Sequence, residues 1–204
     1  SEELISTTLE LLSNQKKKPR LMFCSGRWLT GGMERVLSNL FIHLGDRYDI
    51  YLITPGDDNA TEKVIPIPNT VTHIVLNEDL YLDRFDMVAF TYAKLLDVDI
   101  VVGFLNLRDV QLNLYERCIK NGIKTIASNH EYYFFPYRSP NADMRRLALR
   151  RKEVYKKLDA VLWLTSFNTA VHCVDADNGY LMPNPNTFGT DSAVKSTATK
   201  NILC

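Results

Sequence analysis

Two adjacent glycines, Gly31 and Gly32, lie between a predicted buried strand at 20–25 and a helical pattern over 33–44. Glycine N–H groups at the start of a helix can receive a phosphate or another oxyanion, because that end of the helix carries partial positive charge. The spacing fits neither the G-x-G-x-x-G turn of dinucleotide-binding folds nor the G-x-x-x-x-G-K-[ST] P-loop. The pair predicts an oxyanion-binding turn, with a plain tight turn as the alternative.

Two charged residues follow these glycines at once. Glu34 and Arg35 are candidates for contacts to a donor phosphate or to an acceptor. Their structural alternative is an acid that complements the helix dipole, beside a solvated basic neighbour.

A histidine, His130, follows the predicted strand at 124–128, and its neighbours Asn129 and Glu131 are candidates for contacts to a donor phosphate or to an acceptor. Ligands of open parallel sheets bind beyond the carboxyl ends of the strands, and an imidazole there can donate to a sugar hydroxyl or a phosphate oxygen. The aromatic run at 132–135 could form a platform for a sugar ring or a lipid chain. The alternatives are a histidine whose role is structural and a hydrophobic loop packed under the sheet edge. No group of His, Cys and carboxylate residues has the spacing of metal ligands, so no metal is predicted.

A strongly basic segment runs from 138 to 157. It contains eight Lys and Arg residues and two acidic residues, which gives a net charge of +6. Clustered cations of this kind can dock on anionic lipid or on a lipid-diphosphate acceptor. A solvated helix face is the alternative. The candidate patch consists of Arg145, Arg146, Arg150, Lys152 and Lys156.

The elements that would position these residues alternate between short β-rich runs and longer helical patterns, which predicts an α/β fold with a doubly wound parallel sheet, a Rossmann-like three-layer domain. Strands are expected at 20–25, 50–54, 63–67, 72–76, 99–104, 124–128, 159–165 and 179–182. Helices are expected at 33–44, 83–97, 108–121 and 141–157, with a short one capped by Ser166.

The 204 residues suit one domain, and 46% hydrophobic with 24% charged residues is typical of a globular protein. A net charge of zero argues against a general nucleic-acid binder. No apolar run approaches the roughly 18 residues of a membrane span. The four cysteines lie in apolar patterns without a C-x-x-C pair, which favours a reducing cytoplasm with the thiols as core residues.

Three segments are expected along the chain. Residues 1–19 read as an amphipathic helix and basic hinge, which could add a second membrane contact. Residues 20–185 form the α/β domain. Residues 186–204 read as a linker followed by the first strand of another domain, so we expect a fragment of a longer chain.

Five motifs, in this order over residues 20–204, resemble the family 4 glycosyltransferases. They are Gly31-Gly32-Met33-Glu34-Arg35-Val36, Asp99-Ile-Val-Val, Ser128-Asn-His130, Tyr155-(x)₃-Asp159-Ala-Val with Ser166, and Pro183-Asn-Pro185. Members of that family are retaining enzymes of the GT-B fold, with two Rossmann-like domains facing a cleft. The resemblance implies that this chain is the N-terminal, acceptor-side domain, inactive without its C-terminal donor domain. It also implies that Gly31 and Gly32 lie against the donor diphosphate and that His130 is the catalytic histidine of the cleft.

Such a transferase uses a nucleotide-sugar as substrate, needs no further cofactor and acts on a glycan or lipid-linked acceptor in polysaccharide biosynthesis. We expect it in the cytoplasm, with a possible peripheral position on the inner face of the membrane. Cleavage builds negative charge on the leaving diphosphate, which helix N-terminal amides could stabilise without a metal. Two alternatives stay open: a non-catalytic module that binds a phosphorylated ligand or a membrane, and a GT-B sugar-nucleotide epimerase, for which Glu131 is the one obvious carboxylate near a strand end.

Overall fold

The computed structural model describes residues 18–56, 65–77, 82–104, 108–130 and 136–184. The expected N-terminal amphipathic helix and the expected linker fall almost wholly outside these ranges. Glu131 and the aromatic run at 132–135 also lie outside the described residues.

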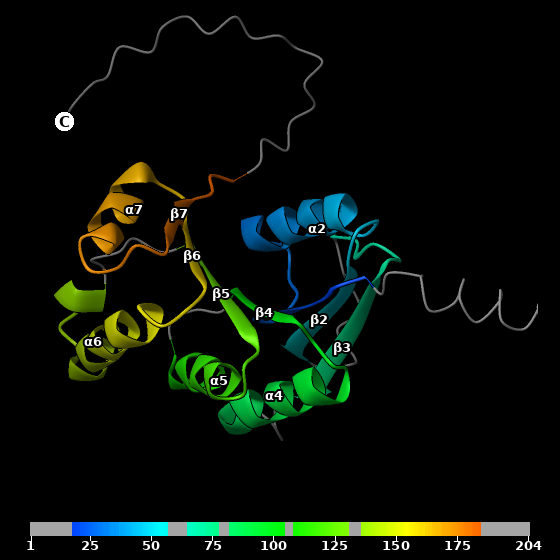
Figure 1. The fold of residues 1–204 in the computed structure, drawn as a ribbon, viewed down its shortest axis with the longest axis horizontal. Helices are drawn as coiled ribbons and strands as arrows, with labels where there is room; N and C mark the ends of the chain where they lie inside the picture. Colours follow the sequence, from blue (N-terminus) through cyan, green and yellow to red (C-terminus); the bar gives the residue numbers. More distant parts are fainter. Residues whose placement is uncertain (1–17, 57–64, 78–81, 105–107, 131–135, 185–204) are drawn as a thin grey trace, which may run out of the picture.

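In the described ranges, all strands run parallel in one seven-stranded sheet of order β3-β2-β1-β4-β5-β6-β7 (Figure 1). The chain winds outward from β1 in one direction to β3 and in the other to β7. This confirms the predicted α/β, doubly wound, Rossmann-like fold. The strands are β1 (Arg20–Ser25), β2 (Asp49–Gly56), β3 (Val71–Asn77), β4 (Ile100–Phe104), β5 (Lys124–Asn129), β6 (Ala160–Trp163) and β7 (Gly179–Leu181).

Helices cover both faces of the sheet. Figure 1 shows α2 on one face and α4, α5 and α6 on the other, with α7 beside β6 and β7. Two single 3-10 turns precede α4 and α6. The helices are α2 (Gly32–Leu44), α4 (Phe85–Leu95), α5 (Asp109–Lys120), α6 (Ala142–Tyr155) and α7 (Ser166–Cys173), and the 3-10 turns are η1 (Leu82–Arg84) and η2 (Pro136–Arg138).

The side-chain alternation of β1 shows how the two faces are filled. Leu21 and Phe23 pack with Phe41 of α2, whereas Met22 and Cys24 pack in the cluster that α4 and α5 cover. Because both faces of the sheet are buried, the inner strands are continuous apolar runs, and this made them visible in the sequence. By the same alternation Ser25, the last residue of β1, belongs to the α2 face.

Several local predictions were wrong. Within the expected strand at 63–67, the described residues from Ile65 onward form no strand; Pro66 and Pro68 cannot donate to a ladder. Thr165, not Ser166, caps α7, because its hydroxyl oxygen accepts the Asn168 N–H at 3.2 Å. Cys173 is exposed, unlike Cys24 and Cys118, which are core residues as predicted.

Candidate functional site

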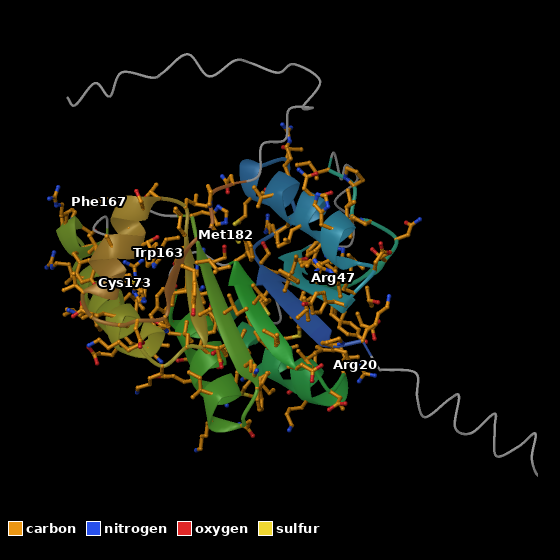
Figure 2. The ribbon with its side chains drawn as sticks, turned by 45° about the horizontal axis from the view of Figure 1, so that its top comes forward. Arg20, Arg47, Trp163, Phe167, Cys173 and Met182 are labelled. Carbon is orange, nitrogen blue, oxygen red and sulfur yellow. The ribbon has the colours of Figure 1, made fainter. Side chains whose placement is uncertain are left out.

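The crevice expected of a doubly wound sheet lies at the carboxyl ends of β1 and β4, where the winding reverses. Ser25 pairs with Phe104 there, at the last position of each strand. Figure 2 helps to locate the two edges of the sheet: Arg20 begins β1 at the amino edge, and Met182 follows β7 at the carboxyl edge. The loop from β1 to α2 leaves from the carboxyl edge, which brings the Gly31-Gly32 turn to the crevice.

The two glycines play different roles. Gly31 is the N-cap of α2 with extended backbone (φ −126°, ψ 173°), and no side chain caps the helix. A Cβ on Gly31 would overlap Oε2 of Glu34, whereas a Cβ on Gly32 would meet nothing within 4 Å. Gly31 is therefore needed for close packing against Glu34, and open space lies in front of Gly32.

The Glu34 side chain folds back onto the loop that precedes its own helix. The side chain is buried, and Oε1 accepts the backbone N–H of Leu29 at 3.3 Å. A carboxylate in the first turn of a helix is stabilised by the helix dipole, which is the structural role weighed for this residue. The same charge would repel a phosphate close to Gly31, so an oxyanion would approach through the open side at Gly32. The Arg35 side chain, next in sequence, is exposed.

His130 lies directly after β5. Its Nε2 is 3.4 Å from the Ser128 hydroxyl oxygen, and its ring centroid is 5.3 Å from that of Phe104. The imidazole is half-buried, and burial lowers the pKa of His130 below its usual value. It is therefore neutral at pH 7, with one ring nitrogen able to donate and the other able to accept.

Ser25 is the residue that the sequence analysis missed. Its side chain is 1% exposed, and its hydroxyl has no hydrogen-bond partner among the described residues. A buried hydroxyl without a partner is costly, and such a group calls for a specific explanation, for example an ordered water or a functional role. The signal was available, because a serine that closes the first strand of a doubly wound sheet faces the crevice.

Asn129 does not join this group. Successive residues of a strand point to opposite faces, and the Asn129 carbonyl oxygen accepts the Tyr155 hydroxyl at 2.9 Å on the α6 face. Its Nδ2 is buried without a hydrogen-bond partner in the described part of the chain. The structure thus gathers Ser25, Phe104, Ser128 and His130 on the α2 face and directs Asn129 to the other.

The basic patch on α6 is paired with neighbouring groups. These contacts compensate much of the charge that the sequence shows, whereas the sequence analysis weighed a solvated helix face against a docking surface. Arg145 donates to the carbonyls of Ser139 and Pro140, Arg146 contacts Asp109 at 2.7 Å, Arg150 contacts Asp109 and Glu116 at 2.6 Å each, Lys152 contacts Asp175 at 2.8 Å, and Lys156 contacts Glu153 at 3.0 Å.

One arginine of the same segment is not on the surface at all. Arg151 is 1% exposed, and its guanidinium lies about 6 Å from the ring centroids of Tyr137, Tyr155 and Trp163. Cation–π contacts of this kind stabilise a desolvated guanidinium. Arg151 therefore belongs to the packing between α6 and β6 rather than to a docking surface.

The described residues show neither a metal-binding cluster nor a membrane-spanning helix. They contain no cluster of three or more His, Cys, Asp or Glu side chains that could hold a metal ion. None of their helices is both long enough and apolar enough to cross a membrane.

Comparison with known proteins relies on structure alone. A scan against protein-family models finds no match, and a search of curated proteins finds none either. Solved structures of similar fold include HepE from Anabaena in complex with UDP (TM-score 0.55, 13% identity), a UDP-glucosyltransferase from Polygonum tinctorium capable of glucosylating indoxyl (0.58, 10%) and MurG from Acinetobacter baumannii (0.50, 14%).

These alignments cover 81% of this chain and 44% of HepE, 85% and 54% for the Polygonum enzyme, and 85% and 47% for MurG. The chain thus spans about half the length of the structures that it resembles. At these identities the similarity shows a shared fold: this chain has the Rossmann-like α/β architecture that these proteins contain.

Proposed function

We propose that this chain is the acceptor-side half of a retaining glycosyltransferase that transfers a sugar from a nucleotide-sugar to a glycan or glycolipid. The observation that carries the proposal is the placement of the α2 N-terminus and the neutral His130 imidazole at the carboxyl edge of the sheet, on either side of the switch point. The shared fold supports it, because the similar structures include HepE bound to UDP and a UDP-glucosyltransferase.

The chemistry requires charge stabilisation more than a nucleophile on this half. Transfer breaks the bond between the anomeric carbon and the diphosphate oxygen and forms one to the acceptor oxygen. The electron pair of the broken bond stays on the diphosphate, which also takes the acceptor proton. The amides at the open side of Gly32, with the exposed Arg35, are suited to that developing negative charge.

His130 would act on the sugar rather than on the phosphate. A neutral imidazole that faces the crevice can donate to a sugar hydroxyl with one nitrogen and accept from the Ser128 hydroxyl with the other. The Phe104 ring holds the imidazole in place from one side. The nucleotide-sugar is the donor substrate, and no cofactor is proposed.

The epimerase reading is not proposed, because near this crevice the described carboxylate is Glu34, and it is already bonded to the loop backbone. Contact of α6 with anionic lipid stays a prediction. Sedimentation with vesicles that contain or lack anionic lipid tests it, and binding that ignores lipid charge and salt would contradict it.

The test is turnover of UDP-, GDP- and dTDP-sugars by the natural full-length protein and its variants, beside the 204-residue chain. His130→Ala should lower turnover about tenfold or more, because it removes a hydrogen bond made to the reacting sugar. His43→Ala, at an exposed position of α2, is the matched control and should leave turnover unchanged.

Three outcomes have distinct meanings. Loss of turnover in His130→Ala with an unchanged thermal unfolding midpoint supports the transferase. Near-wild-type turnover in that variant contradicts the role of His130. A folded full-length protein that neither hydrolyses nor binds any of the three donors would favour the non-catalytic binding module.

A further inference from the structure

Edge strand β3 offers an open pairing surface on the side of the sheet away from the candidate site. In the described part of the chain, β3 has a single neighbour, β2, and ends the sheet (Figure 1). The outer backbone groups of such a strand can pair with another strand. Proteins usually block this by placing Lys, Pro or inward-pointing charges on the edge or by keeping the edge strand short.

The two edges of this sheet differ in that protection. At the far edge, β7 has only three residues. β3 has seven, Val71–Asn77, with no proline and no Lys, Arg, Asp or Glu. Its one titratable residue, His73, is tied to the Thr54 hydroxyl at 2.9 Å. Among the described residues, the long edge is therefore the one that carries none of these forms of protection.

An apolar groove adjoins β3 on the α4 face. It has a volume of about 410 Å³, and none of its lining residues is charged. Leu95 is 76% exposed and Met87 is 50% exposed, which leaves apolar side chains in contact with water. The groove is lined by Val75, Leu76, Asn77, Met87, Val88, Thr91, Tyr92 and Leu95.

We propose that this surface, made of β3 and the exposed Met87 and Leu95 of α4, binds a second copy of the same chain across a two-fold axis. The two copies of β3 would then pair antiparallel. A two-fold interface brings each residue against the same surface of the partner, so a charged edge would face like charge. The uncharged β3 edge meets this condition.

The register follows from the alternation of β3. Ile74 and Leu76 pack in the cluster with Phe85 and Ala89 of α4, so the even-numbered residues share the α4 face. Pairing centred on Ile74 sets Ile74 against itself and Thr72 against Leu76 of the copy. Directly opposite residues of antiparallel strands point to the same face. The apolar α4-face residues of the two copies would therefore meet.

The ends of α4 provide complementary charge. Asp83 precedes the helix and Lys94 lies in its last turn, and both are exposed. A two-fold axis through β3 makes the two copies of α4 antiparallel, which directs Asp83 at the start of one helix towards Lys94 at the end of the other. Arg84 and Asp97 are further exposed charges at these two ends, and they too are of opposite sign. The two helix dipoles are then antiparallel, an orientation in which they attract each other. It gives a second copy an advantage over an arbitrary extended peptide.

The test is sedimentation velocity over a concentration series. The wild-type chain should show a reversible monomer–dimer equilibrium. Thr72→Lys changes an exposed edge residue and should raise the dimer dissociation constant about tenfold or more, because two buried ammonium groups would enter the interface. Leu95→Lys should act in the same direction. Thr72→Val should retain the dimer.

Leu149→Lys is the matched control, because Leu149 is 60% exposed on α6, at the other end of the sheet. Far-UV circular dichroism and the thermal midpoint establish that each variant is folded. A wild-type chain that stays monomeric at every concentration overturns the proposal, and capture of an added extended peptide by that monomer would assign the edge to a peptide partner instead. A dimer that both Thr72→Lys and Leu95→Lys leave intact overturns it as well.

Discussion

The Glu34 carboxylate occupies the space in which a Cβ on Gly31 would stand, so the glycine and the acid three residues later form one unit at the start of α2. The glycine is not needed for an unusual backbone conformation, because its φ of −126° is open to any residue. It is needed because Glu34 folds back to accept the Leu29 N–H. The Gly31-Gly32 pair therefore combines two features: open space at Gly32, through which a ligand could approach the helix, and close packing of Gly31 against Glu34.

A double-mutant cycle tests this pairing. Gly31→Ala should lower the free energy of unfolding by about 1 kcal/mol, because the methyl group displaces Glu34 from its hydrogen bond. In a Glu34→Ala background the same substitution should cost almost nothing. Urea unfolding measures both values. Gly32→Ala is the control, since its Cβ enters open space. Equal costs of Gly31→Ala in the two backgrounds would contradict the coupling.

Thiol labelling tests the placement of the cysteines. Cys173, at the end of α7 (Figure 2), is exposed and should react with a thiol reagent in the native protein. Cys24 and Cys118 should react only in denaturant, because both are buried and burial raises the pKa of Cys118 to about 12. Peptide mapping by mass spectrometry identifies the labelled sites. Native labelling of Cys24 would contradict the core packing of β1.

The fold was predictable because its inner strands are buried on both faces. Runs such as 100–104 and 160–163 are apolar throughout, and the helices between them repeat at 3.6 residues. The predicted strand at 63–67 is absent over its described residues, 65–67. The segment contains Pro66 and is followed by Pro68, and a proline cannot donate a hydrogen bond to a neighbouring strand, which outweighs the preference of β-branched residues for strands. The doubly wound arrangement followed from the right-handed crossover rule for parallel strands rather than from any single residue.

The candidate site was predictable only where position alone decides it. The turn at Gly31 and His130 were found because they follow strand ends. The Glu34–Leu29 contact and the pairing of the α6 cations depend on side-chain directions in three dimensions, which a charge count does not contain. Asn129 shows the limit most clearly, since one step along a strand moves a side chain to the opposite face.

The ion pairs between α5 and α6 make a second stability prediction. Arg150 bonds to Asp109, Asn113 and Glu116 of α5, at 2.6, 2.7 and 2.6 Å. Arg150→Met should therefore destabilise the fold by about 1 kcal/mol, a cost kept small by partial exposure and reduced further by salt. Lys157→Met, at an exposed position just after the helix, is the control. Urea unfolding at low and high salt measures the difference, and a cost that does not change with salt would contradict an ionic origin.

The pH dependence of stability carries the last prediction. Burial lowers the pKa of His130 in the folded chain, whereas in the unfolded chain the imidazole keeps the usual histidine pKa of about 6.5. In the pH window between these two pKa values, the unfolded chain binds more protons than the folded chain. The contribution of His130 is fully present above that window and is lost as the pH falls through it. His172, whose pKa is also lowered by burial, acts in the same direction.

His130→Gln should therefore flatten the fall in stability between about pH 7 and pH 5 without removing it. Urea midpoints at each pH measure the slope. A steeper slope in His130→Gln would mean that the imidazole is better stabilised as a cation in the fold, and the neutral hydrogen-bonding role proposed for it in the crevice would fail with it.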